Sequence, residues 1–433
     1  MKHLLRSCVL ALLFVPESNA ALGWPQADAT AARIDWNQWR GPHRDGVVEA
    51  ECGPADWERD VERVWTSDVG AGHSSPVVAD GRVFTLTRVD GSEVVTAIEL
   101  ESGSVAWQRD YPVEIGVNPY AQGHGRWPRS TPLAVEGRLF TFGADATLSA
   151  WDAATGELVW RHVRDGGVDT SELFCATSMS PLFDAGRLFV HVGDDSAGAL
   201  VAYRAADGQE LWRTELEGPG YASPVRCDLG GVPQLVTLTM SRVVAVALDD
   251  GELLWSAPFE DEWNENIVTP IVDDRGIAVA GVRSGMRWLR PVPPEPTEDD
   301  DASSAWSVET EWINRRAGLY MSSPVLDGDT LYGFSKERRG QLIAVSIADG
   351  EILWTQQEPA DNASLVRVGE RLVVLTTAGE LMVGVPTEAG WTLEQRYEVA
   401  SSATWAHPVL LPDGFLVKDA SELVRWRLAS SDD

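Results

Sequence analysis

Several residue types and patterns are scarce in this 433-residue chain, and each shortage excludes a class of protein. The chain holds only four cysteines and no C-x-x-C pair, which excludes a disulfide-rich scaffold, a c-type haem site and a cysteine zinc site. Basic residues are outnumbered, with 35 Lys and Arg against 66 Asp and Glu and a formal net charge of −31. Because such a surface repels phosphate, we expect no nucleic acid and no anionic membrane among its partners.

Long hydrophobic runs are also missing, apart from a short one near the N-terminus. Val9–Val15 is too short to cross a bilayer, and it follows the basic residues Lys2 and Arg6. Ser18-Asn19-Ala20 places small residues where signal peptides are cleaved, so residues 1–20 are predicted to be a signal peptide. We therefore expect a periplasmic or secreted protein without a transmembrane segment.

Three cysteines remain after residue 20, namely Cys52, Cys175 and Cys227. Cys175 and Cys227 can form a disulfide only if the fold brings them together, and the other interpretation is two separate buried thiols. The odd number leaves at least one thiol unpaired within a monomer. Cys8 precedes the apolar run instead of following it, which is not the arrangement of a lipidation site.

One phrase recurs along the chain and predicts its fold. In Ala150–Trp160, Asp152 can bond its own turn backbone, Gly156 can take a positive φ, and the following residues alternate like a strand. Related phrases end at tryptophans spaced from 42 residues (354 − 312) to 57 residues (312 − 255) apart. A period of about 40–50 residues with several short strands in each unit predicts a β-propeller. We expect the terminal tryptophans to be structural and to pack between neighbouring blades; they are Trp107, Trp160, Trp212, Trp255, Trp312 and Trp354.

The number of blades follows from the sequence that opens each repeat, small residues and then a proline. Proline loses little at the start of a strand. Seven such openings and a degenerate one at Ala363–Leu365 predict eight blades. The last blade has three strands and ends at Leu428, so we expect Val61–Trp65 to be its fourth strand. The openings are Ser74–Pro76, Ser130–Pro132, Met179–Pro181, Ala222–Pro224, Val268–Pro270, Ser322–Pro324 and Ala406–Pro408.

The predicted fold is thus all-β: an eight-bladed β-propeller of four-stranded antiparallel blades over residues 61–428, closed by an N-terminal strand joining the C-terminal blade. Residues 429–433 form a C-terminal tail. Residues 21–60 are predicted to be an irregular segment that packs on the propeller through Trp36 and Trp39. The alternative is that Arg40, His43 and Arg44 of this segment form an anion site.

Candidate binding residues lie in the loops that lead into the inner strands, because these loops converge on the mouth of the central channel. His73, His124 and His407 come from adjacent blades and could together ligate a metal, but we favour the interpretation that each caps a strand or bonds neighbouring backbone, and no metal site is assigned. Arg126 and Arg129 stand out in an acidic chain and favour anion recognition. No catalytic residue is assigned, because no nucleophile elbow, metalloprotease helix or P-loop is present. The candidate channel-mouth set is His73, His124, Arg126, Trp127, Arg129, Trp405 and His407.

The repeat itself resembles that of a known family. Ala150–Trp160 carries A-x-D-x-x-T-G-x-x-x-W, and Ala247–Trp255 carries a shorter version; both resemble the PQQ-like β-propeller repeat, over about residues 61–428. That family includes quinoprotein dehydrogenases, which bind PQQ with Ca²⁺ above the channel, and the assembly lipoprotein BamB. The adjacent cysteine pair of many such alcohol dehydrogenases is absent here, and no calcium-ligand or catalytic Asp motif can be matched.

These observations favour a monomeric, secreted, non-enzymatic binding or scaffolding propeller that recognises a protein or a small ligand at the channel mouth. One alternative is a PQQ-dependent alcohol or sugar dehydrogenase. Another is a BamB-like outer-membrane assembly factor. A flat slot at the channel mouth, with an aromatic floor and carboxylate walls, would favour the dehydrogenase.

Overall fold

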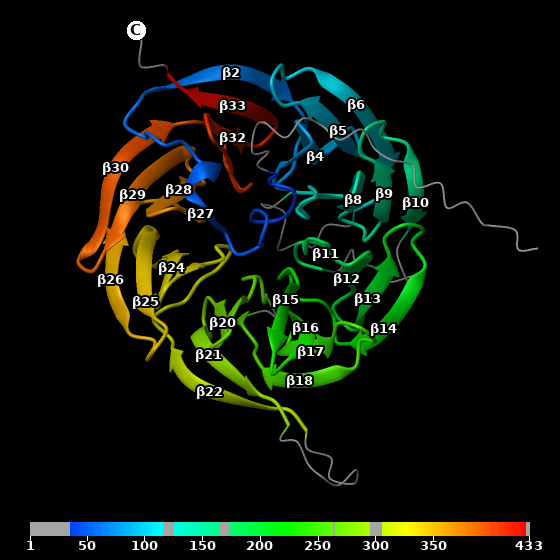
Figure 1. The fold of residues 1–433 in the computed structure, drawn as a ribbon, viewed down its shortest axis with the longest axis vertical. Helices are drawn as coiled ribbons and strands as arrows, with labels where there is room; N and C mark the ends of the chain where they lie inside the picture. The colour runs from blue at the N-terminus through cyan, green and yellow to red at the C-terminus, as the bar shows by residue number, and fades with distance from the viewer. Residues whose placement is uncertain (1–34, 116–124, 164–172, 263–264, 295–304, 430–433) are drawn as a thin grey trace, which may run out of the picture. The chain divides into compact units, whose positions relative to one another are not determined.

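The structure is a computed structural model that describes residues 35–115, 125–163, 173–262, 265–294 and 305–429. These residues form eight sheets, each built on four antiparallel strands, arranged as blades around a central channel, so the predicted propeller class is confirmed (Figure 1). Helical structure in the described residues is limited to short turns such as η1 (Ala50–Cys52) and η6 (Glu337–Arg339). No helix in the described ranges has the length and hydrophobicity to cross a membrane.

Each blade follows the same order, with its innermost strand first in the chain. The first four blades are β3–β6 (Val77–Ala79, Arg82–Val89, Ser92–Glu99, Val105–Pro112), β7–β10 (Leu133–Val135, Arg138–Phe142, Leu148–Asp152, Leu158–His162), β11–β14 (Leu182–Asp184, Arg187–Gly193, Gly198–Arg204, Glu210–Leu216) and β15–β18 (Val225–Leu229, Val232–Leu238, Arg242–Ala247, Leu253–Pro258).

The next three blades repeat this order, and the eighth takes its outer strand from the N-terminal side. They are β19–β22 (Ile271–Asp273, Gly276–Gly281, Gly285–Val292, Ser307–Asn314), β23–β26 (Val325–Asp327, Thr330–Ser335, Gln341–Ser346, Ile352–Gln357), β27–β30 (Ala363–Val368, Arg371–Thr376, Glu380–Thr387, Gly390–Glu398), and β31–β33 (Val409–Leu411, Gly414–Lys418, Glu422–Leu428) with β2 (Val61–Asp68).

The ring closes as the sequence predicts. The blue strand β2 lies beside the red strand β33 in Figure 1, with Val61 opposite Leu428 and Asp68 opposite Glu422. The strand is longer than the predicted Val61–Trp65, because pairing continues for the whole length of β33. Closure gives the last blade its fourth strand, so neither end of the ring is left as an open sheet edge.

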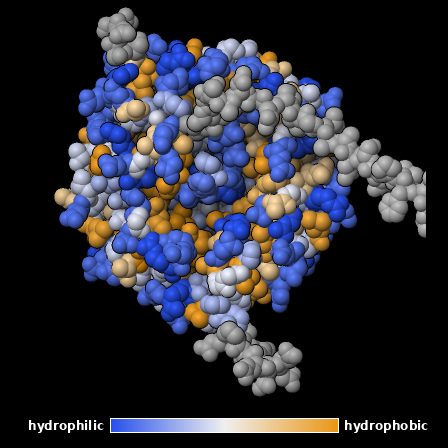
Figure 2. Space-filling model, in the orientation of Figure 1, coloured by the Kyte–Doolittle hydropathy of each residue, from blue (hydrophilic) through white to orange (hydrophobic). Residues whose placement is uncertain are grey.

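The hydrophobic core lies mostly between neighbouring blades. Phe84 and Trp107 of blade 1, for example, share one cluster with Leu139 and Trp151 of blade 2. In the view of Figure 2, hydrophilic residues cover most of the rim and hydrophobic residues lie nearer to the centre. Packing of sheet against sheet therefore holds the ring together.

A β-bulge interrupts every outer strand, and it stands next to a tryptophan in every blade except blade 7, where Gln395 takes that position. In blade 1, Ala97 pairs with Trp107 while Ile98 pairs with Val105, so Ala106 is an extra residue. The same shift of register occurs in the other seven blades. Bulges turn a side chain to a new direction, and here they aim the indole along the ring.

All but one of these tryptophans donate to a turn of the next blade. The Trp107 indole nitrogen donates to the Ala153 carbonyl at 3.0 Å, and its ring covers Gly156. Gly156 has a φ of +70°, and a Cβ there would lie 2.6 Å from Trp107 Cδ2. Trp255 differs, because it donates to Gln234 of its own blade at 2.8 Å. The glycine contact recurs for the pairs Trp65–Gly103, Trp160–Gly208, Trp212–Gly251 and Trp312–Gly350.

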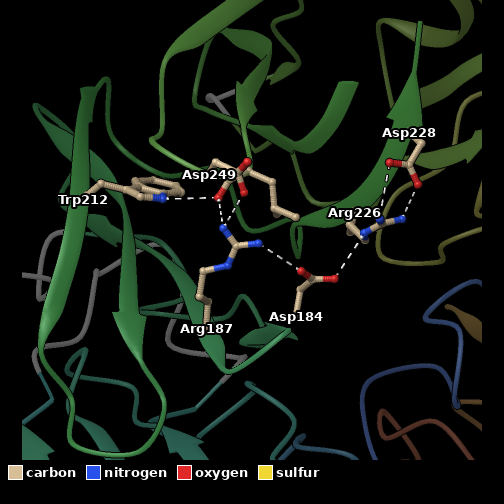
Figure 3. Close-up of polar contacts among 7 residues, drawn as sticks. Asp184, Arg187, Trp212, Arg226, Asp228 and Asp249 are labelled. Carbon is tan, nitrogen blue, oxygen red and sulfur yellow. Dashed lines mark hydrogen bonds and ion pairs between the residues drawn. The ribbon is translucent and has the colours of Figure 1, made fainter. Parts of the chain in front are cut away.

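Arginines at the first turn of a blade add polar links between blades (Figure 3). Arg187 of blade 3 donates to the Leu248 carbonyl of blade 4 at 3.0 Å, and Trp212 donates to the same oxygen at 3.3 Å. Asp184 bridges Arg187 at 3.2 Å and Arg226 at 3.3 Å. Such surface ion pairs are each worth less than about 1 kcal/mol, so the network mainly fixes alignment.

Candidate functional site

The segment before β2 runs through the centre of the ring. Trp36 accepts from the Val78 amide of blade 1 at 2.8 Å, and Asn37 accepts from the Ala134 amide of blade 2 at 2.8 Å. At its other end Gly46 accepts from the Arg367 amide of blade 7 at 2.7 Å, and β1 (Val47–Val48) adds a parallel strand to β27. This segment, residues 36–46, is called the plug below. It is seen in blue at the centre of Figure 1.

Two arginines of the plug are fully buried and bind main-chain carbonyls of inner-strand openings. Arg40 donates to the Pro324 carbonyl at 2.5 Å, and Arg44 donates to the Ser180 carbonyl at 3.0 Å. Burial lowers the pKa of Arg40 to about 10, and burial together with the neighbouring Arg40 charge lowers the pKa of Arg44 to about 9. His43 is exposed, so it takes no part in this buried pair.

The hydroxyl residues before the prolines form a hydrogen-bonded ring, here called the hydroxyl ring. Each hydroxyl accepts the main-chain N–H of the equivalent residue in the preceding blade, at 2.9–3.3 Å. The ring ends before blade 7, whose opening Ala363–Leu365 lacks the signal. This pairing from blade to blade explains why Ser or Thr recurs at this position. The lack of space near the channel would require only a small residue, whereas the pairing requires a hydroxyl. Its members are Ser75, Thr131, Ser180, Ser223, Thr269 and Ser323, and the His407 amide donates to Ser75.

A cavity of about 120 Å³ lies at the channel mouth and is called the mouth pocket. Trp39 of the plug forms part of its wall and donates to Thr269 Oγ1 at 3.4 Å. The rings of His73 and Trp405 stack with centroids 5.6 Å apart on another side. Its lining residues are Trp39, His73, Arg129, Cys175, Ser178, Ser180, Tyr221, Ser223, Ile267, Thr269, Met321, Ser323 and Trp405.

Three of the residues predicted for the channel mouth, His73, Arg129 and Trp405, line this pocket. Arg129 donates to the Gly125, Trp127 and Cys175 carbonyls at 2.8–3.2 Å, so its guanidinium braces the loop. Arg126 is exposed and Trp127 is half-buried in the same loop. His124 lies outside the described residues.

His407 is not at the surface. It is buried against Trp39 with ring centroids 4.5 Å apart, and burial lowers its pKa to about 3. No cluster of three potential metal ligands occurs within the described ranges, which leaves the three-histidine metal site without support there. Cys175 and Cys227 are both free thiols, and burial raises their pKa values to about 11 and about 12.

Trp39 and the hydroxyl ring were missed as pocket residues by sequence reasoning. The contact of Trp39 with Thr269 joins residues 230 positions apart, and no local pattern marks it. For the hydroxyl ring a signal was available, since Ser or Thr stands directly before the proline in six of the openings.

The residues of the mouth pocket do not fit PQQ with Ca²⁺. The pocket has an aromatic wall, but its described lining contains no carboxylate, and Ca²⁺ takes six to eight oxygen ligands with Asp and Glu prominent. A volume of about 120 Å³ suits a single ring, whereas PQQ has three fused rings. The slot with carboxylate walls that would favour a dehydrogenase is therefore not present in the described residues.

Comparison with known proteins finds similarity to BamB proteins and, over a shorter stretch, to a dehydrogenase subunit. The family model described as outer membrane protein assembly factor BamB matches residues 55–226, 91–356 and 239–431. BamB of Shewanella oneidensis is 24% identical over 321 residues, covering 73% of this chain and 63% of that protein. BamB of Yersinia pestis is 25% identical over 309 residues, covering 66% and 70%. Methanol dehydrogenase subunit 1 of Methylorubrum extorquens is 25% identical over 182 residues, covering 37% and 26%.

Solved structures show the same fold. BamB from Moraxella catarrhalis matches with a TM-score of 0.58 and 14% identity, covering 86% of this chain and 99% of that one. Quinohemoprotein alcohol dehydrogenase from Comamonas testosteroni matches with a TM-score of 0.64 and 14% identity, covering 93% and 82%. At such low identity these likenesses concern the fold alone. The family model, by contrast, spans nearly the whole propeller, and the chain therefore belongs to the outer membrane protein assembly factor BamB family.

Proposed function

We propose that this chain is a periplasmic scaffold that assists the assembly of outer-membrane proteins, the role named in the description of its relatives. The observation that carries the proposal is the family match from residue 55 to residue 431, which spans nearly the whole ring. The mouth pocket argues against the competing dehydrogenase function, because its described lining does not suit the quinone of the dehydrogenase relatives. The predicted signal peptide, residues 1–20, would direct the chain to the periplasm.

We further propose that the loop 125–129 contacts the partner protein. The Trp127 indole packs against Gly125, which has a φ of +68°. A side chain at position 125 would collide with the indole. Arg129 holds the carbonyls of both residues, so the loop is braced before binding. Arg126 is exposed on it. Trp and Arg are the residues that most often dominate binding energy, and a pre-organised loop loses little entropy on binding.

Deletion of the gene tests this proposal. We expect the deletion to lower the amount of folded β-barrel protein in the outer membrane, measured by heat-modifiable mobility of those proteins in gels. The wild-type gene should restore the amount, and Arg126→Ala with Trp127→Ala should restore it only in part. Arg204→Ala, a change at another exposed arginine, is the matched control and should restore it fully. Unchanged levels in the deletion strain would refute the proposed function.

A further inference from the structure

The mouth pocket contains hydrogen-bond donors for which the described part of the chain offers no acceptor. Ser180, Ser223, Thr269 and Ser323 of the hydroxyl ring all line it. Each accepts a main-chain N–H, and a hydroxyl has one O–H left to donate. None of the four donates to another residue in the described part of the chain. Buried donors normally find an acceptor, so the pocket is built for a group rich in acceptor atoms.

Two buried arginines bind the main chain of two of these four residues. Arg44 holds the carbonyl of Ser180, and Arg40 holds the carbonyl of Ser323 at 3.5 Å. Both side chains are fully buried, and Arg40 Nε and Nη1 and Arg44 Nε have no hydrogen-bond partner within the described ranges. Asp45 is the carboxylate whose charge acts on Arg40, and it accepts the Val47 amide at 2.8 Å.

The acidic groups near the pocket have partners of their own. Glu265 is the acid that acts on the lining residue Cys175, and its carboxylate is bound by the Tyr320 hydroxyl at 3.0 Å with Lys336 over the Tyr320 ring. Glu265 itself is not part of the pocket lining. The chain's total charge of −31 is screened beyond about 8 Å at physiological ionic strength, whereas buried charges are screened much less. An anionic acceptor is therefore favoured over a neutral one.

The remaining walls are apolar. Trp39, Trp405, Ile267 and Met321 surround the space beside the hydroxyls. An apolar cavity of about 150 Å³ is known to hold benzene, so the enclosed part of this pocket, about 120 Å³, takes one ring at most. The pocket thus has hydroxyl donors at one end and an apolar space about the size of one ring at the other.

We propose that the mouth pocket binds a carboxylate that carries one ring-sized apolar group, with the carboxylate on the hydroxyls and the apolar group against the tryptophans. Such a group occurs in a free aromatic acid and also at the C-terminus of a polypeptide that ends in an aromatic residue. The chemistry recognised is the same in both. The inference does not rest on the proposed function, since binding is measured on the purified protein.

Calorimetric titration of the purified protein tests the inference. We expect 3-phenylpropionate to bind, and its uncharged amide to bind at least about tenfold more weakly, because hydrogen bonds to a charged group are the stronger ones. A peptide ending in phenylalanine, with its carboxylate free or amidated, distinguishes the two sources. Binding of the free peptide identifies a polypeptide end, and binding of the small acid alone identifies a free acid.

Two variants of the same ring provide the control. Thr269→Val removes a hydroxyl that lines the pocket and should weaken binding of 3-phenylpropionate by about tenfold. Thr131→Val makes the same change in the ring outside the pocket lining and should leave binding unchanged. Thermal unfolding of both variants checks that they fold. The inference is wrong if neither the acid nor the peptide binds, if acid and amide bind equally, or if both variants weaken binding alike.

Discussion

Several buried charged residues in this protein are bound by main-chain groups or hydroxyls instead of opposite charges. Arg44 donates to carbonyls, and Lys418 donates to the Gly72 and Asp419 carbonyls at 2.7 and 3.0 Å. Glu93 accepts the Ala144 amide at 2.8 Å and the Tyr111 hydroxyl at 2.6 Å. Neutral dipoles offset only part of the lost hydration, so burial shifts each pKa toward the neutral form. It lowers the pKa of Lys418 to about 8 and raises that of Glu93 to about 7.

The Glu93 carboxyl makes stability depend on pH. Its folded pKa of about 7 lies above the ordinary value of 4.5, so the protonated form favours folding. The stability that this group contributes is fully present below about pH 4.5 and is lost as the pH rises through 7. Glu93→Gln keeps the neutral shape, and we expect it to gain about 2–3 kcal/mol relative to wild type between pH 5 and pH 8. Urea unfolding at both pH values measures this.

The control for that experiment is Glu157→Gln, at an exposed glutamate. It should change the free energy of unfolding equally at both pH values. A Glu93→Gln protein whose difference from wild type stays constant from pH 5 to pH 8 would show that Glu93 is already charged in the folded state.

At the scale of single elements, the outer strand is what links each blade to the next. The bulge turns the tryptophan, the indole nitrogen binds a carbonyl of the neighbouring turn, and the ring covers the glycine of that turn. The glycine and the tryptophan of one motif therefore take part in two different contacts. The glycine packs against the tryptophan of the preceding blade, and the tryptophan packs against the glycine of the next blade. This explains why glycine and tryptophan recur together in the sequence.

A pair of glycine variants separates this packing from backbone strain. Gly156 and Gly186 have φ values of +70° and +78°, but only Gly156 is covered by an indole, and a Cβ at Gly186 meets nothing within 4 Å. Gly186→Ala should cost about 1–2 kcal/mol for its left-handed backbone. Gly156→Ala should cost about 1–3 kcal/mol more, because the added methyl overpacks against Trp107. Chemical denaturation compares the two, and equal losses would mean that the indole contact is not a tight one.

At the scale of the whole molecule, the N-terminal residues complete the propeller in two places. The plug crosses the channel and binds inner-strand openings, and β2 closes the last blade. Trp57, which lies between them, is buried and shares a cluster with Phe415 of blade 8. The N-terminal segment therefore contributes to stability as well as to the wall of the mouth pocket.

Two truncations distinguish these contributions. A chain that begins at Asp60 keeps β2 and loses the plug, and we expect it to stay monomeric but to unfold at a lower temperature. The loss includes the burial of Trp36 and Trp57, about 3–5 kcal/mol for each large aromatic residue removed from a core. A chain that begins at Val69 loses β2 as well and exposes the edge of β33, so we expect it to associate. Size-exclusion chromatography and thermal scans measure both, and a monomeric, fully stable Val69 chain would contradict the role of closure.

Much of this architecture was predictable from residue patterns. Short-range signals, such as the turn at Asp152–Gly156 and the proline after each opening, recur often enough to reveal the eight blades and the shared last blade. The site was less predictable. His73, Arg129 and Trp405 were identified because they stand just before inner strands, but His407 occupies the same kind of position and is buried instead. Whether a loop residue faces the pocket or the core depends on its neighbours in space.

The sequence by itself determined the class, the number of blades and the closing strand, because these follow from local repeats and from the need to pair open edges. Only the tertiary structure decided that residues 36–46 run through the channel and that the Ser and Thr hydroxyls form a hydrogen-bonded ring. It also decided that Trp39 lines a small pocket. Those features consist of contacts between residues far apart in the chain, and no periodic pattern records them.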